Sequence, residues 1–251
     1  MLPDEAQIAP AEPVAPPPLP PAGEPFWGYT DLALFSGLLF ASIAVIVVAV
    51  AFLLAFHPEW RTDQTPLLLP TQFALYALIY LSFRILFQVR YGKPVLKSLG
   101  WRASRFHLAV AAIGGVLLAF AVSGLASLLH TPKIDSPIEK LTNSPVSLAI
   151  FGVMAVTVAP LFEELLFRGF IQPLLSRTFG VVLGVVFTAL LFGALHAPEY
   201  LWAWQYVAAV SLVGMVLGWS RARANSIIPS TVMHGSYNAI FVIALAITKH
   251  M

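Results

Sequence analysis

The chain has 251 residues, of which 59% are hydrophobic and only 10% are charged, and its mean hydropathy is positive. Because a soluble domain carries about 25% charged residues, this composition excludes an ordinary soluble protein and predicts a polytopic membrane protein. The net charge of +2 offers no basic footprint for nucleic acid. The absence of cysteine excludes disulfides, thiolate metal ligands and a cysteine nucleophile.

Residues 1–26 form a segment rich in Pro and Ala that contains no Lys or Arg. We interpret it as a disordered or polyproline-like tail ahead of a membrane domain that covers residues 27–251. It lacks the basic start of a signal peptide, and the apolar run behind it is too long for one. We therefore expect no cleavage.

The remainder of the chain holds about seven apolar runs, within a range of six to eight, that approach the 20 or so residues of a spanning helix. The sequence therefore predicts an all-α, polytopic transmembrane helix bundle. The range reflects a short fifth run and a long fourth run that could break at Pro160. In chain order the expected spans are Leu32–Phe56, Pro66–Val89, Phe106–Leu129, Pro145–Leu175, Gly180–His196, Leu201–Trp219 and Ile227–Thr248.

The Lys and Arg residues of the loops predict the orientation. With seven spans, the side that holds the N-terminus carries more of them than the other side. The two sets are Arg90, Lys93, Lys97, Arg102, Arg105, Arg177, Arg221 and Arg223 against Arg61, Lys133, Lys140 and Lys249. We expect the N-terminus to be cytoplasmic and the protein to reside in the plasma membrane.

Two features of the spans are interpreted as structural. The pairs Gly180/Gly184 and Gly214/Gly218 have the G-x-x-x-G spacing that lets helices approach closely. Arg84 stands alone among apolar residues near the end of the second span, where its side chain can reach the membrane interface.

Glu163 and Glu164 lie deep in an apolar run, where each carboxylate costs roughly 2.5–3.5 kcal/mol on insertion scales. Glu164 and Arg168 are four residues apart on a helix, so they can form an ion pair. Glu163 is rotated by about 100° from its neighbour and is left free to react. Pro160 should kink the helix just ahead of the pair and free a backbone carbonyl, which must then be buried in protein or face a wet cavity.

Three more polar residues lie in later spans: His196 near the end of the fifth, and His234 and Asn238 on one face of the seventh. A carboxylate beside a neutral imidazole can position water and take its proton. A second His and an Asn amide can donate hydrogen bonds to an oxyanion. Glu163, His196 and His234 could instead bind Zn²⁺, which would activate the water directly.

Each residue also has a purely structural interpretation. A lone intramembrane His is often a packing residue bonded to a carbonyl, and Asn238 can be an interhelical hydrogen-bond partner. Glu164 and Arg168 can be no more than a structural ion pair. The conjunction favours a site, because residues on three helices are satisfied together if they converge. Other hydrolase patterns, H-E-x-x-H, G-x-S-x-G and G-x-G-D, are absent from the sequence.

Three motifs occur in order, each on its own apolar helix. They are E-E-x-x-x-R at Glu163, Glu164 and Arg168, F-x-x-x-H at Phe192 and His196, and H-x-x-x-N at His234 and Asn238. With these motifs the chain resembles the CPBP family of intramembrane proteases, which comprises the type II CAAX prenyl proteases and the bacteriocin-processing, or abortive-infection, membrane proteins. The resemblance covers a catalytic core at about residues 145–240.

The resemblance implies a role for each motif residue. Glu163 would be the general base, His196 would help to bind and orient the water, and His234 and Asn238 would form an oxyanion pocket. The neighbouring glutamate–arginine pair would shape and neutralise the site. The family is labelled metalloprotease, and a metal-free glutamate mechanism is also proposed for it. The glutamate mechanism requires no cofactor, whereas the metalloprotease mechanism requires Zn²⁺.

The expected function is an intramembrane endopeptidase that hydrolyses peptide bonds of membrane-associated or hydrophobic C-terminal substrates. Its expected partners are membrane lipid and a membrane-tethered peptide or protein, with no nucleic acid. Two alternatives stay open at this stage. One is a proton-coupled transporter, since buried carboxylates and histidines also make proton relays. The other is a non-catalytic membrane immunity or scaffold protein.

Overall fold

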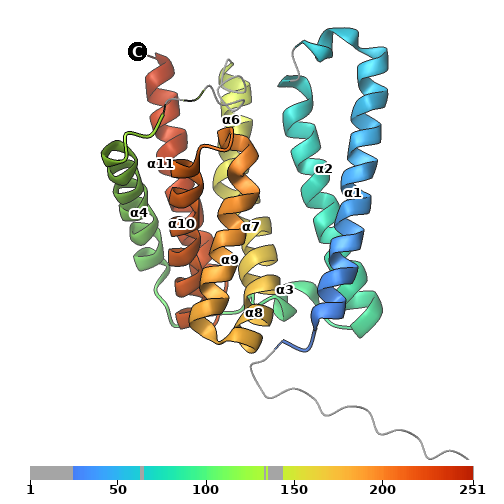
Figure 1. Ribbon diagram of the computed structural model, residues 1–251, viewed down its shortest axis with the longest axis vertical. Coiled ribbons are helices and arrows are strands. Elements are labelled where there is room, and N and C mark those ends of the chain that lie inside the picture. The colour runs from blue at the N-terminus through green and yellow to red at the C-terminus, as the bar shows by residue number, and fades with distance from the viewer. Residues whose placement is uncertain (1–24, 63–64, 133, 135–143, 251) are drawn as a thin grey trace, which may run out of the picture.

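The computed structural model describes residues 25–62, 65–132, 134 and 144–250 (Figure 1). Within these ranges the regular structure is entirely helical. Almost all of the predicted tail and most of the predicted polar loop at residues 130–144 lie outside the described residues. The long helices and their extensions are α1 (Tyr29–Phe56), α2 (Thr65–Arg84), α4 (Leu108–Leu128), α6 (Pro145–Val153), α7 (Ala159–Glu164), α8 (Gln172–Phe179), α9 (Val181–His196), α10 (Trp204–Ala224) and α11 (Ile228–His250).

Short elements connect or interrupt these helices. A four-residue helix, α3, lies in the basic linker after α2. Among the described residues, three π-helical segments extend or interrupt longer helices, and two 3₁₀ turns follow α1 and α9. Their bounds are α3 (Val95–Ser98), the π segments η2 (Ile85–Val89), η3 (Met154–Val158) and η4 (Leu165–Ile171), and the 3₁₀ turns η1 (Pro58–Arg61) and η5 (Ala197–Tyr200).

Six helical stretches of the described chain are long and apolar enough to cross a membrane. They are Tyr29–Phe56, Pro66–Val89, Leu108–Leu128, Pro145–Phe179, Val181–Tyr200 and Ile228–Thr248. The predicted polytopic helix bundle is therefore confirmed, with a count at the lower end of the predicted range. The predicted sixth span corresponds to α10, which is as long as α4, at 21 residues, but is less apolar and is not among the six.

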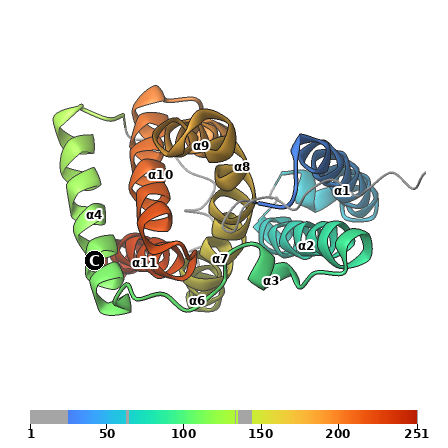
Figure 2. The same ribbon diagram turned by 90° about the horizontal axis from the view of Figure 1, so that it is seen from below.

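The helices from α4 to α11 form the main bundle, and α1 and α2 stand as a hairpin at one edge of it (Figures 1 and 2). In the second view α10 lies among α4, α9 and α11. Among the described elements α1 packs mainly on α2, and large apolar side chains in its middle, such as Phe40, Val48 and Phe52, are exposed. A helix that is apolar all round and exposed in this way is suited to face lipid.

An aromatic cluster ties the hairpin to the bundle at the end where α1 begins. Phe35 of α1 stacks on Phe83 of α2, with ring centroids 4.6 Å apart, and Phe170 of η4 lies 5.1 Å from Phe35. Trp27 joins them, and its indole Nε1 donates a hydrogen bond to the carbonyl of Phe170 at 3.1 Å. Phe170 follows the glutamate pair by about two helical turns. This cluster therefore also holds in place the helix that carries Glu163 and Glu164.

Glycines let the helices behind the site approach closely. A Cβ at Gly214 would crowd the backbone of Ala189, and one at Gly184 would clash with Ser176. The predicted packing role is confirmed for these positions and for Gly218, which faces Gln172. Gly180 differs, because it ends α8 with φ +82° and a Cβ at this position would have no neighbouring atom within 4 Å. It is a turn residue, not a packing residue.

The basic linkers meet at one end of the bundle. Ile227 N donates to the carbonyl of Gly100 at 3.1 Å, and the Ser226 hydroxyl donates to the carbonyl of Arg102 at 2.6 Å. Arg177 donates to the carbonyl of Pro25 at 2.9 Å, so the last residues of the predicted tail segment dock here too. The chain starts α1 at this end and finishes α11 at the other (Figure 1). The side of the membrane that each end faces stays a prediction.

Candidate active site

The helix that carries the glutamates runs from α6 to α8 without the predicted break at Pro160. It passes through the π segment η3 instead. A π-helix pairs each carbonyl with the N–H five residues on, and for Ala155 that residue is Pro160, which has no N–H. The Ala155 carbonyl accepts a hydrogen bond from Asn238 Nδ2 at 2.7 Å. The predicted free carbonyl therefore exists, and α11 satisfies it inside the protein.

Gly235 of α11 explains how the two helices come so close. Its Cα faces the carbonyl of Val156, and any Cβ at this position would overlap that oxygen. Gly235 directly follows His234, so the close approach at η3 carries the imidazole to the level of the glutamates. The H-x-x-x-N motif is thus anchored at both ends, by the small residue beside His234 and by the Asn238 amide.

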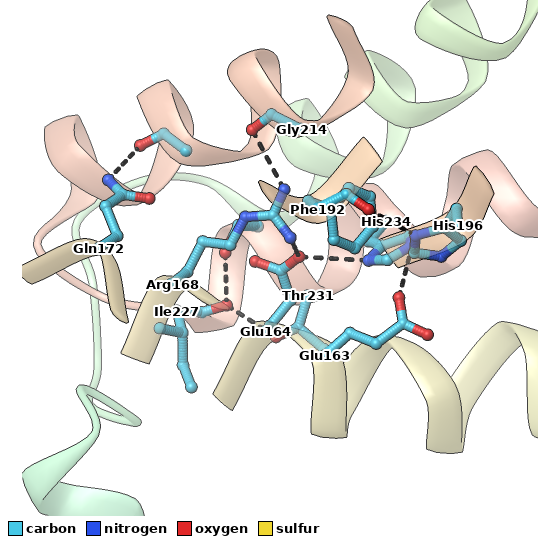
Figure 3. Close-up of polar contacts among 12 residues, drawn as sticks. Glu163, Glu164, Arg168, Gln172, Phe192, His196, Gly214, Ile227, Thr231 and His234 are labelled. Carbon is cyan, nitrogen blue, oxygen red and sulfur yellow. Dashed lines mark hydrogen bonds and ion pairs between the residues drawn. The ribbon is translucent and has the colours of Figure 1, made fainter. Parts of the chain in front are cut away.

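Glu164 and Arg168 form the ion pair that the sequence predicts. Arg168 Nη1 donates to Glu164 Oε1 at 2.8 Å, and neither side chain is exposed (Figure 3). The second guanidinium nitrogen, Nη2, donates to the carbonyl of Gly214 at 3.1 Å, and the guanidinium carbon lies 4.5 Å from the centre of the Phe192 ring. Within the described chain, Glu164 Oε2 and Arg168 Nε have no hydrogen-bond partner.

Gln172 repeats this arrangement one turn further along. Its amide Nε2 donates to the carbonyl of Gly218 at 2.9 Å, just as Arg168 bonds Gly214. The two glycines expose their carbonyls to α8 and η4 because they carry no side chain. Sequence reasoning treated these glycines as packing residues only and did not single out Gln172, although Gln172 follows Arg168 at the same four-residue spacing.

His234 bridges the two glutamates. Its Nδ1 lies 3.2 Å from Glu164 Oε1, and its Nε2 lies 3.7 Å from Glu163 Oε2. The ring is buried, with 5% of its side chain exposed. A ring nitrogen that carries a proton can donate toward the carboxylate that it faces. The sequence predicted His234 as a partner of Glu163, and its contact with Glu164 was not foreseen.

Glu163 is the accessible member of the pair. Its side chain is 21% exposed, whereas that of Glu164 is fully buried. Its contacts are longer than those of Glu164, at 3.7 Å to His234 and 3.4 Å from its Oε1 to the hydroxyl of Tyr76 in α2. Tyr76 was not identified from the sequence, because no spacing links a residue of the second span to one of the fourth.

His196 is the last residue of α9 and lies beside the cluster. Its Nδ1 donates to the carbonyl of Phe192 at 2.7 Å, which leaves Nε2 as an acceptor. The Phe192 ring lies 4.5 Å from the ring of His196 and 5.9 Å from that of His234, so it is packed against both imidazoles (Figure 3). Among the described residues, His196 makes no hydrogen bond to Glu163.

The remaining predictions concern metal and Arg84. The described part of the chain holds no group of three His, Cys, Asp or Glu side chains arranged to bind a metal ion. His234 Nε2 faces Glu163 Oε2 at 3.7 Å, whereas its Nδ1 faces Glu164 Oε1 at 3.2 Å. Binding of Zn²⁺ by Glu163, His196 and His234 stays a prediction. Arg84 is exposed and bonds Gln88 at 2.8 Å, on the hairpin.

Comparison with known proteins gives one match. Residues 144–240 match the family described as type II CAAX prenyl endopeptidase Rce1-like. This segment runs from the start of α6 into α11 and contains all three motifs. The resemblance expected from the motifs is confirmed. The family supports a CAAX-type protease in general terms, without assigning individual residues. No curated protein and no solved structure matches the chain.

Proposed function

We propose that the protein is an intramembrane endopeptidase that hydrolyses peptide bonds of membrane-associated or hydrophobic C-terminal substrates. One observation carries the proposal: His234 of α11 contacts both glutamates of α7, one of them paired with Arg168 and the other accessible. This arrangement provides a free carboxylate, a hydrogen-bond donor aimed beside it and a buried counter-charge, which together suffice for attack by water on an amide.

In the proposed reaction Glu163 acts as the general base. It takes a proton from a water molecule whose second proton is held by His196 Nε2, the nitrogen that its bond to the Phe192 carbonyl leaves free. The water oxygen attacks the scissile carbonyl carbon. Glu163, now protonated, delivers that proton to the leaving amide nitrogen as the oxyanion collapses, and the C–N bond breaks to give a carboxylic acid, which keeps the second proton of the water, and an amine.

The negative oxygen formed during the attack needs hydrogen-bond donors. His234 Nε2 is 3.7 Å from Glu163, a separation too long for a strong hydrogen bond, so it is available to the oxyanion. Asn238 uses one amide hydrogen for the Ala155 carbonyl and retains a second. We assign these two donors to the oxyanion pocket.

The buried ion pair supports this chemistry through His234. Glu164 Oε1 faces His234 Nδ1, which fixes the orientation of the imidazole and directs Nε2 toward the site. Arg168 supplies the charge that allows Glu164 to stay ionised in the bundle, and the Gly214 carbonyl holds the guanidinium in turn. No step of this mechanism requires a metal, so we propose activation of water by glutamate.

Cleavage of peptides by the purified protein in liposomes tests the proposal. The substrates are fluorogenic peptides that end in a CAAX sequence, with and without a prenyl group. We expect wild-type cleavage and a loss of about 10²–10⁴-fold in Glu163→Gln and His196→Ala, since each removes a group that handles the water. Glu59→Gln, which changes an exposed carboxylate in η1, is the control and should retain full activity.

A Glu163→Gln variant that cleaves as fast as wild type would overturn the assignment of the base. Absence of wild-type cleavage, together with proton-coupled solute flux that depends on Glu163, would favour a transporter. Absence of both activities would favour a non-catalytic membrane protein.

A further inference from the structure

Tyr76 is a buried tyrosine of α2 that reaches the site from outside the segment that matches the protease family. Only 6% of its surface is exposed, and its hydroxyl donates to Glu163 Oε1 at 3.4 Å. The matched segment begins at residue 144, whereas Tyr76 belongs to the hairpin at the edge of the bundle. The contact therefore joins two parts of the chain that are 87 residues apart.

The tyrosine ring is held in place by the residue next to the proposed base. It stacks on Phe162 with a centroid separation of 5.1 Å and an angle of 9° between the ring planes. Phe162 directly precedes Glu163 on α7. The ring and the carboxylate are thus fixed relative to the same turn of helix, so the hydroxyl keeps its distance to Glu163 as long as α2 stays packed on α7.

The two oxygens of the Glu163 carboxylate have different partners. Oε1 faces the Tyr76 hydroxyl, and Oε2 faces His234 Nε2. The last torsion of a glutamate side chain is broad, so a free carboxylate would rotate and present its oxygens at varying angles. A donor on Oε1 restricts that rotation and leaves Oε2, on the side of His234, to accept a proton from water.

We propose that Tyr76 is a positioning residue that holds the Glu163 carboxylate in the orientation required to take a proton from water. This inference rests on the proposed function, in which Glu163 is the base. The 3.4 Å separation is long for a hydroxyl–carboxylate bond, and such contacts commonly shorten when substrate occupies the site. The hairpin then contributes to catalysis and does not serve only as a membrane anchor.

The chain offers a matched control in Tyr80. It lies one turn further along α2 and contacts the same Phe162 ring edge-on, with centroids 6.5 Å apart. Unlike Tyr76, it makes no hydrogen bond to Glu163 within the described part of the chain. Tyr76→Phe and Tyr80→Phe therefore delete the same atom from the same helix, beside the same aromatic ring, and differ in the contact with the proposed base.

The test measures kcat and KM for cleavage of the fluorogenic CAAX peptide in liposomes by wild type, Tyr76→Phe, Tyr80→Phe, Glu163→Asp and Tyr76→Phe/Glu163→Asp. We expect Tyr76→Phe to lower kcat about tenfold with KM changed by less than about twofold, because a bond to a charged group is lost while substrate contacts remain. Tyr80→Phe should match wild type. In the shortened Glu163→Asp background, where the carboxylate is withdrawn from the hydroxyl, Tyr76→Phe should have little further effect.

Three results would overturn the inference while leaving the protease function intact. The first is an unchanged kcat in Tyr76→Phe. The second is a loss of kcat in Tyr80→Phe equal to that in Tyr76→Phe. The third is a tenfold loss of kcat when Tyr76→Phe is added to Glu163→Asp, as large as when it is added to wild type. A rise in KM with kcat unchanged would also count against it, since this would indicate a substrate contact. If wild type does not cleave the peptides, or Glu163→Gln cleaves as fast as wild type, the proposed function and the role of Tyr76 fall together.

Discussion

The two sides of the glutamate pair differ in burial and in the length of their contacts. On the Glu164 side, a fully buried carboxylate and guanidinium meet at 2.8 Å and are held by a backbone carbonyl of α10. On the Glu163 side, a partly exposed carboxylate has neighbours at 3.4 and 3.7 Å from α2 and α11. Two adjacent glutamates therefore differ in environment: Glu164 is enclosed, whereas Glu163 is accessible.

The difference shows two ways of placing a carboxylate in an apolar bundle. Glu164 is stabilised by a neighbour of opposite charge in its own helix, and its side chain has no space for a ligand. Glu163 lacks such a partner and is surrounded by donors on other helices, so it can exchange its contacts for water or substrate. We expect substitutions on the closed side to reduce stability first, and those on the open side to reduce activity first.

The largest effect on stability is expected from Arg168→Met. It leaves Glu164 buried without its counter-charge, and loss of one partner of a buried pair costs about 3–5 kcal/mol. Thermal unfolding in detergent and the yield of folded protein would report this loss. Glu163→Gln is the comparison, with an unfolding temperature close to that of wild type.

The double variant Glu164→Gln/Arg168→Met separates charge from packing. It removes both charges and keeps similar side-chain volumes, so much of the stability lost in Arg168→Met should return. If the double variant were no more stable than the single one, the ion pair would not be the reason for the loss. Equal destabilisation by Glu163→Gln would remove the distinction between the two sides.

Asn238→Ala should moderately reduce both the stability of the protein and its kcat. It deprives the Ala155 carbonyl of its donor, at a cost of about 1–3 kcal/mol, and it removes a proposed oxyanion donor, at a cost of about 10²–10³ in kcat. Unfolding temperature and kcat would be measured on the same preparation. Ser236→Ala, which removes a hydroxyl bonded within α11, is a control on the same helix.

A loss of stability in Asn238→Ala with kcat unchanged would assign the residue to helix packing alone. The oxyanion pocket would then consist of His234 and a donor from elsewhere. This outcome would place Asn238 on the closed, structural side of the comparison.

The smallest effect is expected from metal chelators. Because the proposed mechanism uses glutamate and two imidazoles, 1,10-phenanthroline and EDTA should leave kcat within about twofold of its starting value, whereas a metal-dependent site loses activity as the ion is removed. Metal analysis of the purified protein would accompany the assay. Loss of cleavage on chelation, with recovery on adding Zn²⁺, would instead assign Glu163, His196 and His234 to a metal centre.

Much of the membrane architecture followed from the order of the residues. Apolar runs of about 20 residues placed the helices, because their length and composition act locally. The fourth span was harder, since it could have broken at Pro160, whereas π segments on either side of α7 keep the helix continuous. Whether a proline bends a helix or is absorbed in this way depends on what neighbouring helices offer the freed carbonyl, in this case Asn238.

The sequence by itself determined the membrane class, the ion pair of Glu164 with Arg168 and the order of the three motifs. These depend on composition and on spacing within a single helix, where a separation of four residues brings side chains together. Only the tertiary structure decided that His234 contacts both glutamates and that Tyr76 faces Glu163. These contacts join α2, α7 and α11, and the close approach of such helices depends on packing at positions such as Gly235 that no local pattern specifies.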